Sequence, residues 1–363
     1  MPLFMDFHII NDITVEEVKR AHIADLAVQD KYGVTYHQFW INEDAGSLFC
    51  LIEGPDKESC ERVHTEAHGN IACQIVKVES GFFKTLMGNS YTVDHGLVIG
   101  EKGEIDPANR FVLVVDIRGK TKASGITAIS DLAFPDEPKK LVRRIIPIYH
   151  GRLIKSNDYV MAAFTEADSA VSCAIEIRRQ LTRKLDASIN SNWNIQFKIG
   201  LAGGQPVTRR NEFFEQTVQL SQRLCLIADE NDIVISSLVK KFCSFQDELN
   251  TLKPIHLPEE EFLKKLIDIA EEKMSDTEFN VEKLCREIGI SRPQLYRKVV
   301  SVTGKSPVQF IRELKMNKAL FLIRERNLNI AEISLSVGYN NPSYFSRCFQ
   351  NAYGVQPSHY LSD

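Results

Sequence analysis

The chain has 363 residues, of which 44% are hydrophobic and 25% charged, and its formal net charge is −4. This length predicts two or three domains, and no run of about 18 apolar residues indicates a membrane-spanning helix. The eight cysteines include no CxxC pair, and the start of the chain does not resemble a secretory signal. We therefore expect a cytoplasmic protein with reduced thiols. The negative charge excludes a protein that coats nucleic acid with its whole surface.

The first 80 residues alternate between strand and helix patterns. Thr14 and Glu17 can form a capping box, and Gly33 and Gly69 can close two helices. The order strand, helix, strand, strand, helix, strand predicts a ferredoxin-like α+β unit over residues 1–80. The predicted strands are Leu3–Ile10, Thr35–Ile41, Ser47–Ile52 and Ile71–Val78, and the predicted helices start at Thr14 and Asp56.

Histidine spacing within this unit indicates a candidate metal site. His64 and His68 lie four residues apart on the second helix, so both imidazoles are on one face and within reach of one ion. Imidazole and thiol ligands together suit nickel, copper or zinc rather than magnesium or calcium. Two interpretations need no metal. His68 can complement the helix dipole in a last turn, and His64 can be a half-buried, hydrogen-bonded histidine beside an apolar stripe.

Four stretches of the unit, MDFH, AHIADLAVQDKYGV, FCLIEGPDKES and VHTEAHG, resemble a family of small nickel-binding ferredoxin-like domains. The resemblance covers residues 1–80 and implies a sensor domain that binds nickel or another transition metal ion. In that family the unit is often fused to a cyclase-type domain. The ligand residues that the resemblance implies are His8, His22, Cys50, His64 and His68.

The middle of the chain predicts a second α/β region. Residues 81–108 are rich in glycine and turn residues and are expected to form a connector. The apolar run Phe111–Val115 predicts a strand buried on both faces, and helical apolar spacing predicts a helix over Glu166–Lys184. The region is expected to cover residues 109–245 and to be followed by a linker at 246–258. Further strands are predicted at Ile195–Leu201 and Asp232–Ser236.

The segments FVLVVDIRGKT, GRLIKSNDYVMAAF, IGLAGGQPV and EFFEQTVQLSQRLC resemble parts of class III nucleotide cyclases. The resemblance implies a cyclase-like α/β sandwich. It carries the two metal-binding aspartates of that family to Asp116 and Asp158, and its transition-state arginine to Arg223. Two such carboxylates can hold two metal ions, and the guanidinium can stabilise charge that develops on phosphorus.

This segment also departs from the cyclase pattern. Gln219 replaces an asparagine, Glu215 stands where glycine is usual, and the shortened hairpin leaves Lys155 without an assigned role in purine recognition. Because the parts of a catalytic site act as a unit, we expect no enzyme activity and a domain kept for dimerisation or nucleotide sensing. The alternatives are an active cyclase that converts ATP or GTP to a cyclic nucleotide, and an Asp116 that merely caps a turn.

Residues 259–363 are predicted to be helical and contain an internal repeat. Aligning LCREIGISRPQLYRKVVSVTGKSP with ISLSVGYNNPSYFSRCFQNAYGVQP pairs Leu295 with Phe345 and Arg297 with Arg347. Each copy predicts a short helix, a glycine turn and a longer helix, which is the pattern of a helix-turn-helix. From residue 281 onward, 12 Lys and Arg stand against 6 Asp and Glu, so nucleic acid is expected to bind at this end.

The outer face of each longer helix carries side chains that can bond base edges and phosphates. An amphipathic helix over Ser306–Arg324 would separate the two copies, which suits successive major grooves roughly 34 Å apart. The candidate DNA-binding residues are Ser291, Arg292, Gln294, Tyr296, Arg297, Lys298, Asn341, Ser343, Tyr344, Ser346, Arg347 and Gln350.

The motifs GKSPVQFIRELKMNKA and SYFSRCFQNAYGVQPSHY resemble the AraC/XylS family of transcription regulators. The resemblance implies a seven-helix tandem helix-turn-helix domain that binds operator DNA, in a chain expected to form a homodimer with no membrane contact. The whole chain is therefore interpreted as multidomain α+β plus all-α, a transcription regulator with an N-terminal sensor. The alternatives are a helical interaction domain with a solvated basic face, and a metal-storage protein.

Overall fold

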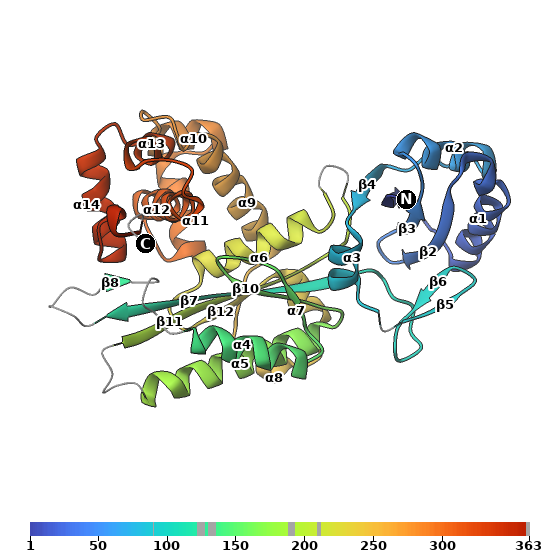
Figure 1. The fold of residues 1–363 in the computed structure, drawn as a ribbon, viewed down its shortest axis with the longest axis horizontal. Helices are drawn as coiled ribbons and strands as arrows, with labels where there is room; N and C mark the ends of the chain where they lie inside the picture. The colour runs from blue at the N-terminus through green and yellow to red at the C-terminus, as the bar shows by residue number, and fades with distance from the viewer. Residues whose placement is uncertain (90, 122–127, 130–135, 188–192, 209–211, 361–363) are drawn as a thin grey trace.

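The computed structural model describes residues 1–89, 91–121, 128–129, 136–187, 193–208 and 212–360. Two β-sheets and one helical region follow one another along the chain (Figure 1). The N-terminal sheet and its helices lie at one end, the middle sheet lies at the centre, and the helical C-terminal region packs over the other end of the middle sheet. No helix in the described ranges is long and apolar enough to cross a membrane.

The N-terminal region has the strand order expected of a ferredoxin-like unit. Four antiparallel strands run in the order β4-β1-β3-β2, and α1 and α2 contact each other beside them. Thr14 and Glu17 form the predicted capping box at the start of α1, and Asp56 caps α2. The elements are β1 (Leu3–Ile9), α1 (Val15–Val28), η1 (Gln29–Tyr32), β2 (Thr35–Asn42), β3 (Ser47–Glu53), α2 (Lys57–Ala67) and β4 (Gln74–Val78).

The segment expected to be a connector is more ordered than its glycines indicate. It holds α3 (Ser80–Met87) and a hairpin of β5 (Thr92–Asp94) and β6 (Leu97–Ile99). Strand β6 pairs in parallel with β2 and so widens the N-terminal sheet to six strands. Strands of three residues are too short to give an alternating pattern, which is why the sequence predicts only turns here.

The middle region is a sheet in the order β13-β12-β11-β7-β10-β9, with β8 paired to β7. Helices α4 and α5 pack on one face, and α6 packs on the other, against β11 and β7 (Figure 1). The predicted strands and helix are confirmed, and the segment expected to be a linker contributes α8 and the edge strand β13. The strands are β7 (Arg110–Thr121), β8 (Ala128–Ile129), β9 (Arg152–Ile154), β10 (Val160–Phe164), β11 (Trp193–Gly204), β12 (Ile233–Ile235) and β13 (Lys253–Pro254). The helices are α4 (Glu137–Ile148), α5 (Ala167–Ala187), α6 (Glu215–Ile227), α7 (Ser237–Phe242) and α8 (Gln246–Leu249).

The N-terminal and middle sheets share one hydrophobic core. Met5 and Phe7 of β1 pack in the same buried cluster as Val112 and Val114 of β7, and Cys225 of α6 joins them. Two arginines of the middle region also hold the end of α3. Arg152 donates to the carbonyl oxygens of Thr85 and Leu86, and Arg110 donates to that of Met87. The two regions are therefore packed together through apolar contacts and arginine hydrogen bonds.

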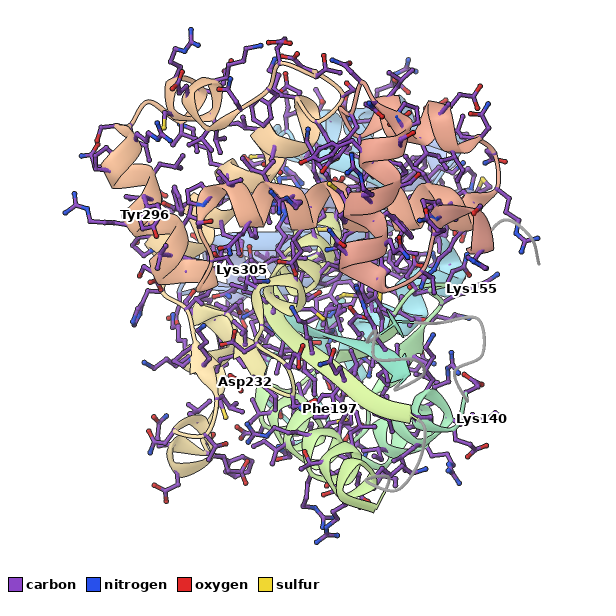
Figure 2. The ribbon with its side chains drawn as sticks, turned by 90° about the vertical axis from the view of Figure 1, so that its left-hand side faces the viewer. Lys140, Lys155, Phe197, Asp232, Tyr296 and Lys305 are labelled. Atoms are coloured by element: carbon purple, nitrogen blue, oxygen red, sulfur yellow. The ribbon has the colours of Figure 1, made fainter. Side chains whose placement is uncertain are left out.

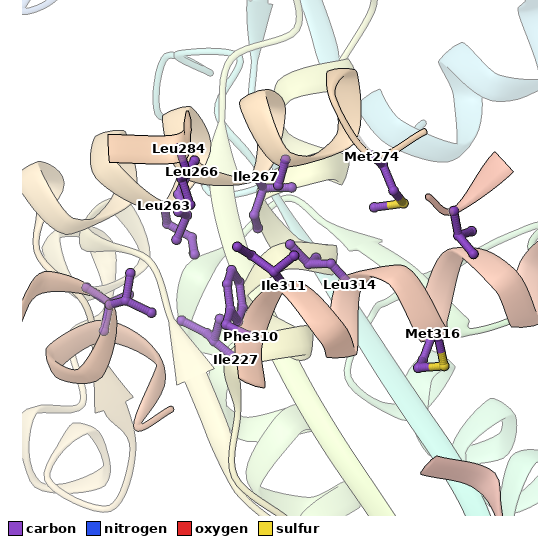
Figure 3. Close-up of a cluster of buried hydrophobic side chains, with 14 of the residues drawn as sticks. Ile227, Leu263, Leu266, Ile267, Met274, Leu284, Phe310, Ile311, Leu314 and Met316 are labelled. Carbon is purple, nitrogen blue, oxygen red and sulfur yellow. The ribbon is translucent and has the colours of Figure 1, made fainter. Parts of the chain in front are cut away.

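After β13, the described residues of the C-terminal region form helices and the turns that join them and contain no strand, as predicted. Its core also includes Ile227 of α6, which packs near Phe310 and Leu263 in a cluster that joins the helical region to the middle region (Figure 3). The elements are α9 (Leu257–Glu272), α10 (Val281–Ile288), α11 (Arg292–Thr303), α12 (Pro307–Glu325), α13 (Ile330–Ser336), α14 (Pro342–Tyr353) and the short helix η3 (Pro357–Tyr360).

Helix α6 lies very close to β11 because Gly200 has no side chain. A Cβ atom at Gly200 would overlap the backbone oxygen of Ser221 and the backbone nitrogen of Cys225. We predict that Gly200→Ala lowers the free energy of unfolding by about 1–3 kcal/mol, because α6 must move away from the sheet. Chemical denaturation of the full chain measures this change.

The matched control is Gly81→Ala. Gly81 lies in α3, and a Cβ atom there would have no heavy atom within 4 Å. Alanine in a helix is favoured over glycine by up to about 1 kcal/mol, so this variant should be neutral or slightly stabilised. Equal stability of both variants would show that α6 does not depend on close contact with β11.

Candidate metal centre and DNA-binding surface

A cavity of about 440 Å³ lies in the N-terminal region, between α1 and α2 on one side and the strands on the other. The five residues that the sequence indicated as metal ligands all line it, although they come from two strands and two helices. The ionisable and metal-ligating residues of its wall include His8, His22, Asp25, Cys50, His64 and His68.

Asp6 holds two of these histidines at the bottom of the cavity. Its side chain is fully buried, and its Oδ2 lies 2.6 Å from Nε2 of His64 and 3.2 Å from Nε2 of His8. Its Oδ1 accepts a hydrogen bond of 2.7 Å from the backbone N–H of Cys50 on the neighbouring strand. Because Asp6 and His8 alternate with Met5 and Phe7 along β1, these polar groups face the helices and the apolar ones face the middle region.

Asp25 of α1 faces the other nitrogen of His64. Its Oδ1 lies 3.4 Å from Nδ1 of His64 and 3.2 Å from Nε2 of His68, but neither contact has hydrogen-bond geometry. The two histidine rings are themselves 3.2 Å apart between Nδ1 of His64 and Nε2 of His68. Asp25, His64 and His68 thus place three potential ligand atoms within 4.8 Å of one another, as do Asp6, His8 and His64.

His22 and Cys50 line the cavity outside these two clusters. Nδ1 of His22 is buried and has no hydrogen-bond partner among the described residues. The turn at Gly96 passes directly over this ring, where a Cβ atom would overlap it. Burial, together with the nearby carboxylates of Asp6 and Asp25, raises the pKa of the Cys50 thiol well above its usual value.

The electrostatics of the site are dominated by the two buried carboxylates. Burial alone would lower the pKa of His64, but its close contact and charge interaction with Asp25, and its hydrogen bond and charge interaction with Asp6, raise that pKa to about 10. Burial would raise the pKa of Asp6, but the charges and hydrogen bonds of His8 and His64 lower it. Without a metal ion, a proton on His64 balances the carboxylates, and a bound cation would supply that positive charge instead.

The sequence pattern missed Asp25 as a site residue. Val18, His22 and Asp25 form the buried stripe of α1, which has helical spacing but two polar members. A histidine and an aspartate on the buried side of a helix are costly unless they pair or bind an ion. That stripe is the sequence signal from which Asp25 could have been found.

The C-terminal region contains two helix-turn-helix units, α10–α11 and α13–α14, joined by α12. Gly289 and Gly338 adopt positive φ values of 81° and 73° between the helices of each unit, as the repeat predicts. Ser291 and Gln294 form a capping box at the start of α11, and the side chain of Asn341 accepts hydrogen bonds from two backbone N–H groups of α14. These three residues therefore have a structural role at the helix starts in addition to any contact with DNA.

The predicted DNA-binding residues form two exposed helix faces with two exceptions. All five predicted residues of α11 are exposed, and Tyr296 lies at the outer edge of the helical region (Figure 2). On α14, Ser346 and Gln350 are half-buried, and Gln350 accepts a hydrogen bond from Gln356. Lys298 lies over the ring of Phe262, 5.2 Å from its centre. Arg297 and Arg347 occupy equivalent exposed positions on α11 and α14.

The three cyclase-like candidates are each held by other residues of the chain. Asp116 forms an ion pair of 2.8 Å with Arg118 of its own strand. Asp158 pairs with Arg324 of α12, and Arg223 pairs with Asp268 of α9. Burial, and then the nearby charge of Asp116, raises the pKa of Asp158.

The structure does not gather these three side chains at one cavity. Asp116 lines a cavity between β7 and α12, but Arg223 is absent from the described lining of that cavity and faces α9 instead. Asp116 and Asp158 lie near enough for the charge of Asp116 to raise the pKa of Asp158, whereas Arg223 pairs with Asp268 of α9.

Comparison with known proteins identifies the region that contains α10–α14. Residues 284–363 match the family model of a helix-turn-helix domain. A stretch of 101 residues is 31% identical to the HTH-type transcriptional regulator MtrA of Neisseria gonorrhoeae, over 28% of this chain and 32% of that protein. The chain carries an AraC-type helix-turn-helix domain. In this AraC-type domain, α11 and α14 are the second helices of the two helix-turn-helix units.

A second family model, described as nickel responsive protein SCO4226-like, matches residues 4–78. The crystal structure of SCO4226 from Streptomyces coelicolor A3(2) is 40% identical, over 21% of this chain and 94% of that chain, with a TM-score of 0.20. A further 102-residue stretch is 37% identical to Histidine kinase P4 of Formosa agariphila, over 28% of this chain and 7% of that protein. The chain thus spans a third or less of the two curated relatives described.

Proposed function

We propose that the chain is a transcription regulator that binds operator DNA through its AraC-type domain and responds to a transition metal ion. The ion that we propose is nickel. The observation that carries the sensor role is the largely buried cluster of Asp25, His64 and His68, whose ligand atoms converge although Asp25 Oδ1 has no hydrogen-bond partner among the residues that the structure describes. The similarity of residues 4–78 to nickel responsive proteins supports nickel as the ion.

The donor set suits a metal of this kind. Imidazole nitrogens bind nickel, copper and zinc, and the carboxylate of Asp25 offers an anionic oxygen beside them. In the proposed site, Asp25 Oδ1, Nδ1 of His64 and Nε2 of His68 hold the ion. Asp6 then acts as an outer partner that accepts a hydrogen bond from Nε2 of His64 and so fixes its ring. The bound ion supplies positive charge between two buried carboxylates.

Metal binding would also move a proton within His68. The backbone N–H of Asn70 donates to Nδ1 of His68 at 3.1 Å, so the proton of the neutral ring lies on Nε2. When Nε2 binds an ion, the ring proton must lie on Nδ1, and the hydrogen bond from Asn70 is lost. The turn after α2 is therefore the part of the backbone that loses a hydrogen bond when the ion binds.

For the middle region we propose a non-catalytic role, in which it connects the sensor domain to the DNA-binding domain. Two observations support this proposal. The three cyclase-like candidates are paired within the chain, and Arg324 and Asp268, which hold two of them, belong to helices of the C-terminal region. Residues that a cyclase would use on its substrate thus hold the two regions together.

Metal binding is tested by calorimetric titration of the metal-free full chain with nickel. We predict saturable binding, and at least about tenfold weaker binding for His68→Ala, because the variant loses a ligand. His68 is chosen because its side chain is 15% exposed, whereas removal of His64 would take a partner from two buried carboxylates, Asp6 and Asp25, at once. His37→Ala is the control, since His37 lies outside the cavity and pairs with Glu53. Equal nickel affinity of the wild type and His68→Ala would refute the proposed site.

Operator binding is tested with DNA selected from a random pool by the full chain. We predict that Arg297→Ala and Arg347→Ala each lose about 1–3 kcal/mol of discrimination against altered bases at one half of the operator. Lys240→Ala is the control, because Lys240 is exposed on α7 in the middle region. Electrophoretic mobility shift measures the affinities. Unchanged specificity in both arginine variants would exclude these faces as the recognition surface.

A further inference from the structure

A second cavity, of about 650 Å³, lies between the middle sheet and the AraC-type domain. Its floor is made by β7, β11 and the end of α6, and its roof by α12 and α14. Lys305, just before α12, and Phe197 of β11 belong to its two walls, and Figure 2 shows Lys305 at the lower edge of the helical region and Phe197 within the middle region. This cavity shares no residue with the proposed metal site.

Four cationic side chains line this cavity from both sides. Arg118 and Lys198 come from the sheet, and Lys305 and Arg312 come from the AraC-type domain. Two carboxylates face them. Asp116 is occupied by Arg118, and Glu313 is shared, because Lys305 pairs with its Oε2 and Lys198 lies 3.7 Å from its Oε1.

The two other acidic residues of the lining have partners of their own. Asp229 pairs with Lys253, and Glu230 accepts a hydrogen bond from Gln196. Arg312 has no ion-pair partner within the described ranges. Together with Lys253, which pairs with Asp229 from outside the lining, five cationic side chains thus stand against four acidic ones among the described residues in and beside the cavity, in a space partly shielded from water.

Partial exclusion of water from the cavity strengthens the attraction of its cationic side chains for an anion. The side chain of Lys198 is 22% exposed, and its desolvation lowers its pKa, so an additional anion nearby would stabilise its charged form. Apolar and amide groups complete the walls. Leu226 and Met316 offer apolar contact, and Asn317 offers an amide.

We propose that this cavity binds a small organic anion, a molecule with a carboxylate or phosphate group on a compact body, as a second effector. The anion lies between Lys198 of the sheet and Lys305 of the AraC-type domain and competes with Glu313 for both ammonium groups. Because the ligand touches both regions, its binding favours one arrangement of the recognition helices over others. Only this last consequence for DNA binding rests on the proposed function, and the binding itself does not.

The test is calorimetric titration of the metal-free full chain with citrate, glucose 6-phosphate and inorganic phosphate in turn, at about 0.15 M salt, where exposed charges are largely screened. We predict saturable binding of at least one of the three. Binding of citrate alone would indicate a carboxylate ligand, and binding of either phosphate compound would indicate a phosphate ligand. Lys198→Met and Lys305→Met should each weaken binding at least about tenfold, since each removes a charge-assisted hydrogen bond.

Lys240→Met is the matched control, because Lys240 is an exposed lysine of the middle region outside the cavity. It should bind the anion like the wild type. Thermal unfolding of all three variants checks that they are folded, and the agreement of two variants from opposite walls excludes a local folding defect. Absence of saturable binding for all three anions, or binding that both cavity variants retain, would overturn the proposal. Because no DNA is present, failure here is distinct from failure of operator binding.

Discussion

The close contact between α6 and β11 is the constraint on which the arrangement of the three regions depends. Gly200 lets the backbone of α6 lie directly on the strand, and that position fixes what each face of the helix can reach. Cys225 packs into the core shared by the N-terminal and middle sheets, whereas Ile227 packs into the core of the AraC-type domain. Arg223 adds an ion pair to α9. One short helix thus contacts both hydrophobic cores, and a displacement of it would affect both.

Strand β1 connects the proposed metal site to this helix through its two faces. Asp6 and His8 lie on the face of β1 that contacts His64, and the alternating residues Met5 and Phe7 pack in the core that contains Cys225. A change in the charge of the cluster would act on β1, and tightly packed side chains on its other face would carry a shift toward α6. The path consists of packed contacts, so it is a physical route by which the N-terminal region could influence the DNA-binding domain.

Much of the local structure could be predicted because its causes are local. The capping residue Thr14 lies where the sequence indicates, and Gly289 and Gly338 adopt the positive φ values that the glycine turns of the repeat require. The candidate metal ligands also line one cavity, because helical spacing and strand alternation determine which side each residue faces.

Long-range pairing could not be predicted in the same way. The role of Asp25 depends on α1 lying beside α2, and the pairing of Asp158 with Arg324 joins residues 166 positions apart. The three-residue strands β5 and β6 gain their order from β2 rather than from their own pattern. Asp116 and Arg223 resembled parts of one site because their sequence context is cyclase-like, but ion pairs with Arg118 and Asp268 give them separate surroundings.

The central claim is that metal binding at one end of the chain changes DNA binding at the other. The most direct measurement is the dissociation constant of the full chain for its selected operator, with a chelator and with saturating nickel, in the wild type and in His68→Ala. The account predicts a change of at least about fivefold in the wild type, which corresponds to the lower range of allosteric coupling, and a much smaller change in the variant. Equal operator affinity with and without bound nickel would contradict it.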